Sequence, residues 1–202
     1  MTFATIEHAL EQLRSGRPVL VLDDEDRENE GDAILAAELA SPQWVGWMVR
    51  HTSGYLCAPM EDTRADRLGL PLMWSANTDP LRTRYTVSVD VSTSTTGISS
   101  VERAATTRAL ADPRTTSADL IRPGHVLPLR ARDGGVLTRR GHTEAAVDLT
   151  RLAGLQAVGL IGEIVHDDGT CARTPDVLAL GQAEGLDVIT IESLANWRRS
   201  HE

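Results

Sequence analysis

The sequence predicts an α/β protein of the α+β type: a single domain in which helices cover a mixed, twisted sheet in a layered sandwich. Segments with helical periodicity alternate with short apolar segments along all 202 residues. Several strand-like segments are joined by short turns, which favours a mixed sheet over a doubly wound parallel one. Because no repeat, low-complexity tract or linker interrupts the sequence, we expect one domain over residues 1–202.

The first elements follow from apolar spacing and from residues that end helices. Apolar side chains repeat at helical spacing from Ile6 to Leu13, and Gly16 can end that helix. The uninterrupted apolar run at 19–22 predicts a buried strand, and residues 32–39 predict another. Further strands are predicted at residues 55–58, 85–91, 125–131, 157–165 and 188–191.

Capping residues mark where the later helices begin and end. Ser41 followed by Pro42 is an N-cap with proline at the first helical position. Ser99 and Glu102 have the spacing of a capping box, and Gly185 can end a helix. Helices are therefore predicted at residues 42–51, 100–111, 143–153 and 174–184, with a short helix at the C-terminus.

Two segments are predicted to be irregular. Residues 166–170 contain the Asp-Gly signal of a hairpin turn. Residues 74–84 are polar, poorly periodic and interrupted by Pro80, so they form a candidate mobile loop.

The charge balance and the apolar pattern exclude several classes of protein. With 29 acidic and 20 basic residues the formal net charge is −9, which argues against a nucleic-acid-binding protein, since such proteins normally carry a basic face. No apolar stretch is long enough to cross a bilayer, and the N-terminus lacks the features of a signal peptide. The two cysteines form neither a disulfide framework nor a zinc-binding spacing, so we expect a reducing, cytoplasmic setting.

The densest group of chemically active side chains is the acidic segment DDEDRENEGD, directly after the first predicted strand. Carboxylates this close together repel one another unless a cation or an arginine offsets their charge. In an extended chain, Glu28, Glu30 and Asp32 would alternate onto one side. Arg27 and Asn29 would then face the other side. The carboxylate side could hold a hard divalent cation, although a solvated acidic loop is the commoner outcome for such a run.

A second group of candidates lies in the middle of the chain. His125 follows a Pro-Gly turn and precedes a predicted strand. The segment TRRGHTE leads into a predicted helix, whose first amides, with Arg139 and the Thr143 hydroxyl, would suit a phosphate. His142 could give an imidazole nitrogen to a metal. Glu163 lies in an apolar strand, where a carboxylate without a partner is costly, so it should be paired or functional.

Each of these features alone has a simpler explanation. A single histidine before a strand more often packs or faces solvent than it catalyses, and Glu163 could end its strand facing outward. The co-occurrence of carboxylates, histidines and arginines in one small domain is what favours a site. Cys57 is interpreted as a core residue whose thiol could also line the site. The histidines to which we assign only a structural role are His8, His51, His166 and His201.

Four segments of the chain form a distinctive set. They are VLDDEDRENEGD (21–32), TTGISSVERAATTRAL (95–110), RPGHVLPLRARDGGVLTRRGHTEAAVDL (122–149) and GEIVHDDGT (162–170). In this order, over essentially the whole chain, they resemble the 3,4-dihydroxy-2-butanone 4-phosphate synthase family. The resemblance implies a Mg²⁺-dependent lyase of riboflavin biosynthesis, which converts D-ribulose 5-phosphate into 3,4-dihydroxy-2-butanone 4-phosphate and formate.

The resemblance also implies roles for individual residues. Glu28 and His142 correspond to the metal ligands, and His125 and Glu163 correspond to positions essential for catalysis. The implied substrate-binding positions are Arg27, Glu28, Asp32, Arg139, Arg140, Gly141, His142, Thr143 and Glu163. Asp23, Glu30 and Cys57 correspond to residues that line the same pocket, with less defined roles.

The family further implies two Mg²⁺ (or Mn²⁺) ions per site, an acidic loop that orders when ligands bind, and a homodimer with sites near the subunit interface. Many relatives are fused to a GTP cyclohydrolase II domain, whereas this chain resembles the stand-alone form without that domain. Three features depart from the family pattern. Arg140 stands where some relatives have Gly, Glu102 replaces an expected Asp, and residues 73–84 match loosely.

Other functions were weighed against the lyase. The main alternative is a non-catalytic protein on the same fold that binds a sugar phosphate or a nucleotide. The absence of His125 or Glu163 would support this alternative, and both residues are present. A nucleotide- and RNA-binding module of a related fold is disfavoured by the net charge of −9. A metal-dependent phosphate hydrolase would release inorganic phosphate in place of formate.

Overall fold

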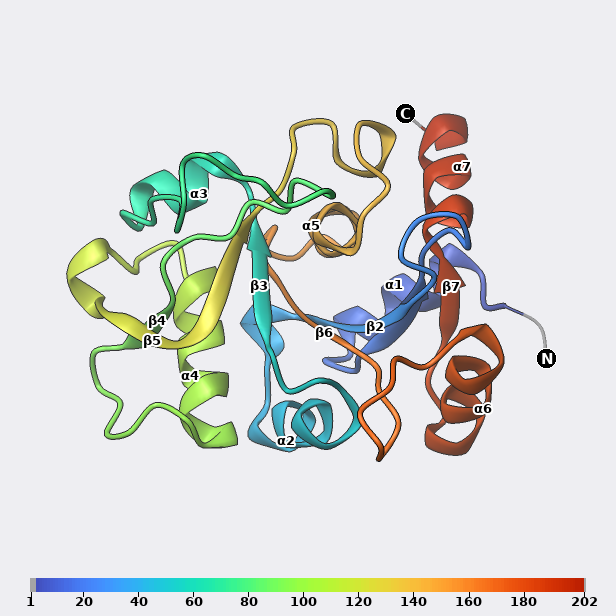
Figure 1. The fold of residues 1–202 in the computed structure, drawn as a ribbon, viewed down its shortest axis with the longest axis horizontal. Helices are drawn as coiled ribbons and strands as arrows, with labels where there is room; N and C mark the ends of the chain where they lie inside the picture. The colour runs from blue at the N-terminus through green and yellow to red at the C-terminus, as the bar shows by residue number, and fades with distance from the viewer. Residues whose placement is uncertain (1–2, 202) are drawn as a thin grey trace.

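The computed structural model describes residues 3–201, which form one seven-stranded sheet with helices on both faces (Figure 1). The strands are β1 (Val19–Leu22), β2 (Gly31–Ala36), β3 (Cys57–Met60), β4 (Val89–Val91), β5 (Leu120–Arg130), β6 (Gly159–Glu163) and β7 (Val188–Thr190). The helices are α1 (Ile6–Arg14), α2 (Pro42–His51), α3 (Asp62–Arg67), α4 (Ser100–Ala111), α5 (His142–Leu152), α6 (Thr174–Glu184) and α7 (Ile191–His201). Short 3₁₀ turns lie at Ala37–Leu39, Ser117–Asp119 and Gly135–Leu137.

The sheet is mixed, as predicted. Its strand order is β4-β5-β3-β6-β2-β1-β7. Strand β3 runs parallel to β5, and β1 runs parallel to β7, whereas the other neighbours are antiparallel. In Figure 1 the direction of β3 differs strongly from that of β2, so the sheet is also twisted.

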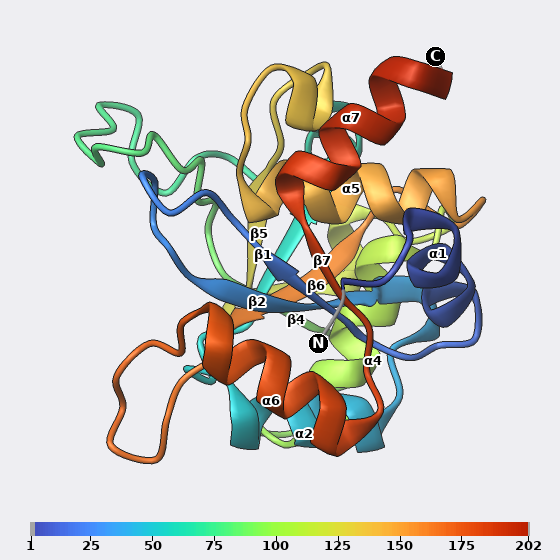
Figure 2. The same cartoon turned by 90° about the vertical axis from the view of Figure 1, so that its right-hand side faces the viewer.

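Two apolar cores lie on the two faces of this sheet. In β1, Val19 and Val21 pack into one core, and Leu20 and Leu22 pack into the other. Helices α1, α5 and α7 cover the first face, and α2, α4 and α6 cover the second (Figure 2). Burial on both faces explains why the run at 19–22 is apolar without alternation, and the predicted layered sandwich is confirmed.

The predicted helix starts are confirmed where a side chain caps the first turn. The Ser41 hydroxyl accepts a hydrogen bond from the Trp44 amide, and the Ser99 hydroxyl accepts one from the Glu102 amide. Gly185 ends α6 with φ = 62°, a left-handed conformation that glycine adopts without steric cost. Local chemistry therefore decides these boundaries.

Strand boundaries were predicted less well. The extended segment predicted at 125–131 belongs to β5, which begins at Leu120 and continues through Pro123 and Gly124. The Pro-Gly turn predicted before His125 is therefore wrong, because these residues form an irregularity in the pairing of β5 with β4. The strand predicted at 85–91 is regular only over Val89–Val91, although Tyr85 forms an isolated bridge with Leu129.

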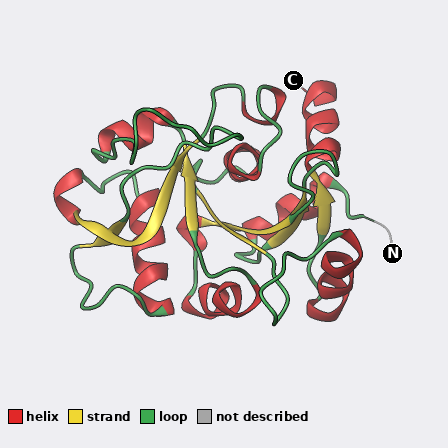
Figure 3. Cartoon of the chain, viewed as in Figure 1, coloured by secondary structure: helices red, strands yellow, loops and turns green. Residues whose placement is uncertain are grey.

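Other differences are smaller. The strand predicted at 32–39 ends at Ala36 and passes into a 3₁₀ turn, and the strand predicted at 55–58 begins at Cys57. Helix α3 was not predicted, because its six residues are mostly charged and only Ala65 is buried. Residues 74–84 form a long irregular loop, as predicted (Figure 3). Its mobility stays a prediction.

Candidate active site

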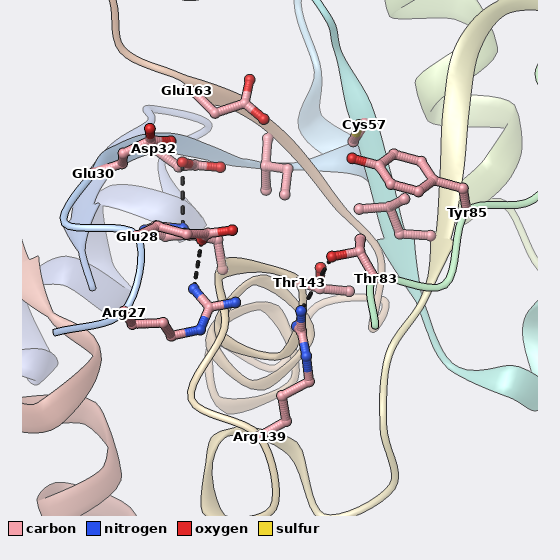
Figure 4. A pocket seen from close by; sticks show the side chains of 13 residues that line it. Arg27, Glu28, Glu30, Asp32, Cys57, Thr83, Tyr85, Arg139, Thr143 and Glu163 are labelled. Carbon is pink, nitrogen blue, oxygen red and sulfur yellow. Dashed lines mark hydrogen bonds and ion pairs between the residues drawn. The ribbon is translucent and has the colours of Figure 1, made fainter. Parts of the chain in front are cut away.

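A polar pocket lies where the loop after β1 faces the start of α5 (Figure 4). It encloses about 410 Å³ of free space, part of it open to solvent. The lining side chains come from segments that are far apart in the sequence. They are Arg27, Glu28, Glu30, Asp32, Cys57, Thr83, Tyr85, Leu129, Arg139, His142, Thr143, Ile161 and Glu163.

The acidic loop is folded around the Asp23 carboxylate. Asp23 accepts hydrogen bonds from the backbone amides of Glu28 and Glu30, at 3.1 and 2.8 Å, and from the Arg27 guanidinium at 2.8 Å. The chain turns at these residues, and Asn29 has a left-handed φ of 55°. The segment is therefore not extended, and the alternation of side chains expected for an extended chain does not occur. Arg27 and the carboxylates line the same pocket because the turn folds them to one side.

Glu28, Asp32 and His142 meet at the centre of the pocket. The His142 Nδ1 atom lies 3.7 Å from a Glu28 oxygen and 3.4 Å from an Asp32 oxygen. The His142 Nε2 atom lies 3.0 Å from the Val21 carbonyl, to which it donates. Since that bond holds the proton on Nε2, the Nδ1 lone pair of the neutral ring faces the two carboxylates. The predicted proximity of Glu28 and His142 is confirmed.

The three groups strongly perturb one another's protonation. Burial raises the pKa of Asp32 to about 7, with further contributions from Glu163, Glu28 and Glu30 against the opposing charge of His142. Although burial disfavours a charged ring, Asp32, Glu28 and Asp23 raise the pKa of His142 to about 9. Burial opposes ionisation of Glu28 too, but His142 and Arg27 lower its pKa to about 2. Without a metal the carboxylates therefore keep His142 protonated near neutral pH, and a divalent cation bound here would take the place of the proton on Nδ1.

The side chains of this cluster fit a hard divalent cation. Ligand atoms of Asp23, Glu28 and His142 lie within 4.8 Å of one another. Asp23 is already occupied by the loop hydrogen bonds, whereas the buried Asp32 Oδ1 atom has no hydrogen-bond partner. A buried oxygen without a partner is costly unless a ligand satisfies it. Carboxylate oxygens with one imidazole nitrogen suit Mg²⁺ or Mn²⁺.

Arg139 forms the opposite wall of the pocket. Its guanidinium donates to the buried Glu144 carboxylate at 2.6 Å, to the Leu81 carbonyl and to the Thr83 hydroxyl. Figure 4 shows the Arg139 side chain ending beside Thr83. Arg139 therefore joins the 74–84 loop to the first turn of α5, where Thr143 also faces the pocket. Amides at a helix start and a fixed guanidinium form an anion-binding surface.

Two predicted substrate-binding residues do not line the pocket. Arg140 donates to Asp24 at 2.6 Å and lies in a separate groove on the outer side of the acidic loop. Gly141 precedes α5, and a Cβ atom there would lie 2.3 Å from an Arg139 nitrogen and 2.9 Å from a Glu144 oxygen. The role of Gly141 in the structure is thus to allow Arg139 to approach the helix. Substrate contacts of both residues stay predictions.

Glu163 and Cys57 complete the pocket from the sheet. Glu163 pairs with Asp32 across strands β6 and β2, and its carboxylate accepts a hydrogen bond of 2.6 Å from the Ser53 hydroxyl. It is therefore a paired carboxylate at the pocket edge. Cys57 is buried, and burial together with Glu163 and Asp32 raises the pKa of its thiol well above the usual value. Cys57 is thus a neutral thiol that both belongs to the core and lines the pocket.

Comparison with protein-family models matches residues 7–197 to 3,4-dihydroxy-2-butanone 4-phosphate synthase. The chain belongs to this family. The resemblance inferred from the four sequence segments is thereby confirmed. Relatives of the synthase domain include the riboflavin biosynthesis protein RibBA of Salinispora arenicola, 57% identical over 202 residues, which cover 100% of this chain and 48% of that protein. The protein of the same name from Mycobacterium tuberculosis is 54% identical over 201 residues, 98% of this chain and 47% of that protein.

Solved structures of the synthase family share the fold. A 3,4-dihydroxy-2-butanone 4-phosphate synthase from Candida albicans is 47% identical, with a TM-score of 0.91, and the match covers 98% of each chain. A synthase in complex with two magnesium ions is 44% identical, with a TM-score of 0.90 and 95% of each chain covered. The present chain spans about half the length of the curated relatives named above.

His125, to which a catalytic role was assigned, also lies outside the pocket. It lies on β5, its side chain is 43% exposed, and it does not line the pocket of its own chain. Its ring Nδ1 lies 2.7 Å from an oxygen of Asp90. The predicted catalytic role of His125 stays a prediction, and it requires a way to bring this residue to a pocket.

Thr83 and Tyr85 line the pocket but were not predicted. Thr83 lies in the irregular loop, in the segment that matches the family pattern loosely, and Tyr85 directly follows that loop. Figure 4 shows the Tyr85 hydroxyl pointing toward Cys57. Burial raises the pKa of Tyr85, so its hydroxyl remains protonated and able to donate a hydrogen bond. No periodicity or charge pattern marks these residues, because long-range pairing of Tyr85 with Leu129 brings them to the pocket.

Proposed function

We propose that this chain converts D-ribulose 5-phosphate into 3,4-dihydroxy-2-butanone 4-phosphate and formate, as a Mg²⁺- or Mn²⁺-dependent carbon–carbon lyase of riboflavin biosynthesis in the cytoplasm. The observation that carries the proposal is the meeting of Glu28, Asp32 and His142 in one pocket of a chain from this family. Relatives named for riboflavin biosynthesis, and a solved relative in complex with two magnesium ions, support it.

In this proposal Glu28 and His142 hold the metal, and two ions bind in each site. Val21 keeps the His142 proton on Nε2, so that Nδ1 is available as a ligand. Asp32 contributes a buried oxygen that accepts no hydrogen bond and is available to the cation or the substrate. When bound, the metal polarises the oxygens of the sugar phosphate as a Lewis acid.

Phosphate binding is assigned to the start of α5. Arg139 is held against the pocket by Glu144, which fixes the guanidinium before substrate arrives. The Thr143 hydroxyl and the first amides of the helix add donors for phosphate oxygens. Arg140 and Gly141 belong to the same predicted binding segment. Arg27 adds a second guanidinium that lines the pocket.

Proton transfers are assigned to Glu163 and His125. Glu163 lines the pocket and is oriented by Ser53, so it can act as a general acid or base on the bound substrate. His125 does not line the pocket of its own chain. We therefore assign it to the pocket of a second copy in a homodimer, which agrees with the expectation that sites lie near the subunit interface.

The deciding experiment incubates the purified protein with 1-¹³C- and uniformly ¹³C-labelled ribulose 5-phosphate and Mg²⁺, and follows products by ¹³C NMR. We expect formate and the four-carbon ketone phosphate in equal amounts. Formate should carry label with the uniformly labelled substrate but not with the C1-labelled one, since the reaction releases C4. EDTA should stop the reaction, and added Mg²⁺ should restore it.

Other products would contradict this proposal. Binding of ribulose 5-phosphate without any formate would support the non-catalytic alternative. Release of inorganic phosphate in place of formate would indicate a hydrolase.

A further inference from the structure

His125 is held by an irregularity in the sheet. Val89 of β4 pairs with Val126 of β5, but the next residue, Asp90, pairs with Ile121. The four residues 122–125 of β5 therefore have no pairing partner on β4. The intervening residues bulge out of the ladder. Gly124 crosses directly over the β4 backbone, where a Cβ atom would lie 2.0 Å from the Val89 carbonyl carbon. The irregularity therefore brings the His125 backbone and side chain over Asp90.

The Asp90 carboxylate binds His125 at two points. One oxygen accepts a hydrogen bond of 2.9 Å from the His125 backbone amide, and the other lies 2.7 Å from Nδ1 of the ring. The Asp90 side chain is 8% exposed, whereas that of His125 is 43% exposed. A well-buried acceptor thus fixes both the backbone and the ring of a histidine that faces outward.

Further residues keep this pair in place. Gly97 packs over it, and a Cβ atom there would lie 2.0 Å from the Asp90 carboxylate and 2.7 Å from His125 Nδ1. Gly97 is itself held by a hydrogen bond from its amide to Glu102. The guanidinium of the buried Arg103 lies near Asp90, whose charge partly offsets the effect of burial on the pKa of Arg103. The surroundings therefore leave little room for any other arrangement of the pair.

We propose that Asp90 is the positioning residue for His125: it holds the ring in the Nδ1–H tautomer and leaves Nε2 as the atom that accepts and returns a proton. A carboxylate only accepts hydrogen bonds, so the ring nitrogen beside it must carry the proton. Among residues 3–201, the structure gives Nε2 of His125 no protein partner. This inference rests on the proposed function, in which His125 carries out a proton transfer.

The first test compares Asp90→Asn with the wild type. An asparagine keeps the shape, but its amide group can donate to Nδ1 and favour the wrong tautomer. We expect kcat for formate release to fall on the order of a hundredfold, the range of a lost general acid–base step, with KM nearly unchanged. Asp90→Glu should recover part of the loss. Asp168→Asn removes a carboxylate that binds Thr170 in an exposed hairpin, and it should match the wild type.

A double-mutant cycle separates positioning from a general effect on folding. If Asp90 acts through His125, Asp90→Asn should cost nothing further in the His125→Ala background. Equal losses in both backgrounds would overturn the inference. In parallel, ¹⁵N NMR of protein labelled at histidine, assigned with His125→Ala, should show the Nδ1–H tautomer in the wild type and its loss in Asp90→Asn. A wild-type ring protonated on Nε2 alone would also overturn the inference.

These outcomes are distinct from failure of the proposed function. A wild-type protein that releases no formate would contradict the lyase assignment. A wild type that releases formate would leave the lyase assignment intact. If the losses in Asp90→Asn and His125→Ala were then additive, or if the His125 ring carried its proton on Nε2, only the role of Asp90 would be contradicted.

Discussion

The Glu28 carboxylate lies between the Arg27 guanidinium and the His142 ring, and these two neighbours, against the effect of burial, lower its pKa to about 2. It is therefore ionised over the whole range in which the protein would work. Removing this charge while keeping the shape isolates its part in metal binding.

Glu28→Gln should raise the Mg²⁺ concentration needed for half-maximal formate release and lower activity about a hundredfold or more, because Lewis-acid stabilisation is worth several kcal/mol. The measurement is a Mg²⁺ titration of formate release at saturating ribulose 5-phosphate. Glu25→Gln is the control, because Glu25 belongs to the same loop but lines the outer groove. An unchanged Mg²⁺ requirement in Glu28→Gln would place the metal ligand elsewhere.

Gly141→Ala tests the wall of the pocket. The backbone at Gly141 has φ = −115°, which alanine adopts without strain, so the only new cost is contact of its Cβ with Arg139 and Glu144. Displacement of the guanidinium should raise KM for ribulose 5-phosphate about tenfold, equivalent to one charge-assisted hydrogen bond, with a smaller effect on kcat.

The matched control for that substitution is Gly46→Ala in α2, where a Cβ atom would meet nothing closer than 3.6 Å. It should leave KM unchanged and stabilise the helix slightly. Equal KM values for Gly141→Ala and the wild type would show that Arg139 does not bind the phosphate.

At the scale of elements, the loop that leads into α4 is organised by one half-buried carboxylate, that of Glu102. Glu102 accepts hydrogen bonds from Thr95, Thr96, Gly97 and Ser99. Hydrogen bonds from Thr95 are the main reason that its pKa is lowered to about 2. One carboxylate thus binds four residues of the segment that precedes α4.

This arrangement predicts a pH dependence. A carboxyl group with a lowered pKa stabilises the folded loop above its ordinary value of 4.5, and this stabilisation is lost as pH falls toward 2. Amides of Thr95 and Gly97 should therefore exchange hydrogen faster in Glu102→Gln than in the wild type at neutral pH. The difference should narrow as pH falls below about 4.5.

Native-state hydrogen exchange followed by NMR measures both amides directly. Glu11→Gln, an exposed substitution on α1, should leave their exchange unchanged. A difference between Glu102→Gln and the wild type that stays constant with pH would show that the Glu102 charge does not hold the loop.

The boundaries of helices and strands could be predicted from the sequence where neighbouring residues determine them. The caps at Ser41 and Ser99 and the stop at Gly185 identify helices because each acts within one turn. Strand β5 could not be bounded in the same way. Its passage through Pro123 and Gly124 depends on pairing with β4 and β3, which are far away in the sequence.

At the scale of the whole molecule, the sequence predicts which residues carry chemistry better than where they meet. Glu28 and His142 were assigned to one metal site through the family resemblance, and the β1–β2 hairpin and α5 bring them together. The enclosing residues Thr83 and Tyr85 were missed, because a long irregular loop carries them to the pocket. His125 was assigned to the site, yet the single chain keeps it away from the pocket.

Composite sites in a homodimer would resolve the position of His125, and mixed dimers test this idea. Glu28→Gln and His125→Ala should each be nearly inactive alone. In a heterodimer of the two, one site would combine the intact Glu28 of one copy with the intact His125 of the other. The second site would contain both substitutions.

Random reassortment of equal amounts makes half of the dimers mixed, each with one good site of two, so the mixture should regain about a quarter of wild-type activity. The variants are unfolded and refolded together, and formate release is compared with that of each variant refolded alone. Sedimentation must show a dimer in every sample. Dimers that reassort without regaining activity would mean that His125 serves its own chain or has no part in the reaction, because sites built within one copy cannot complement each other.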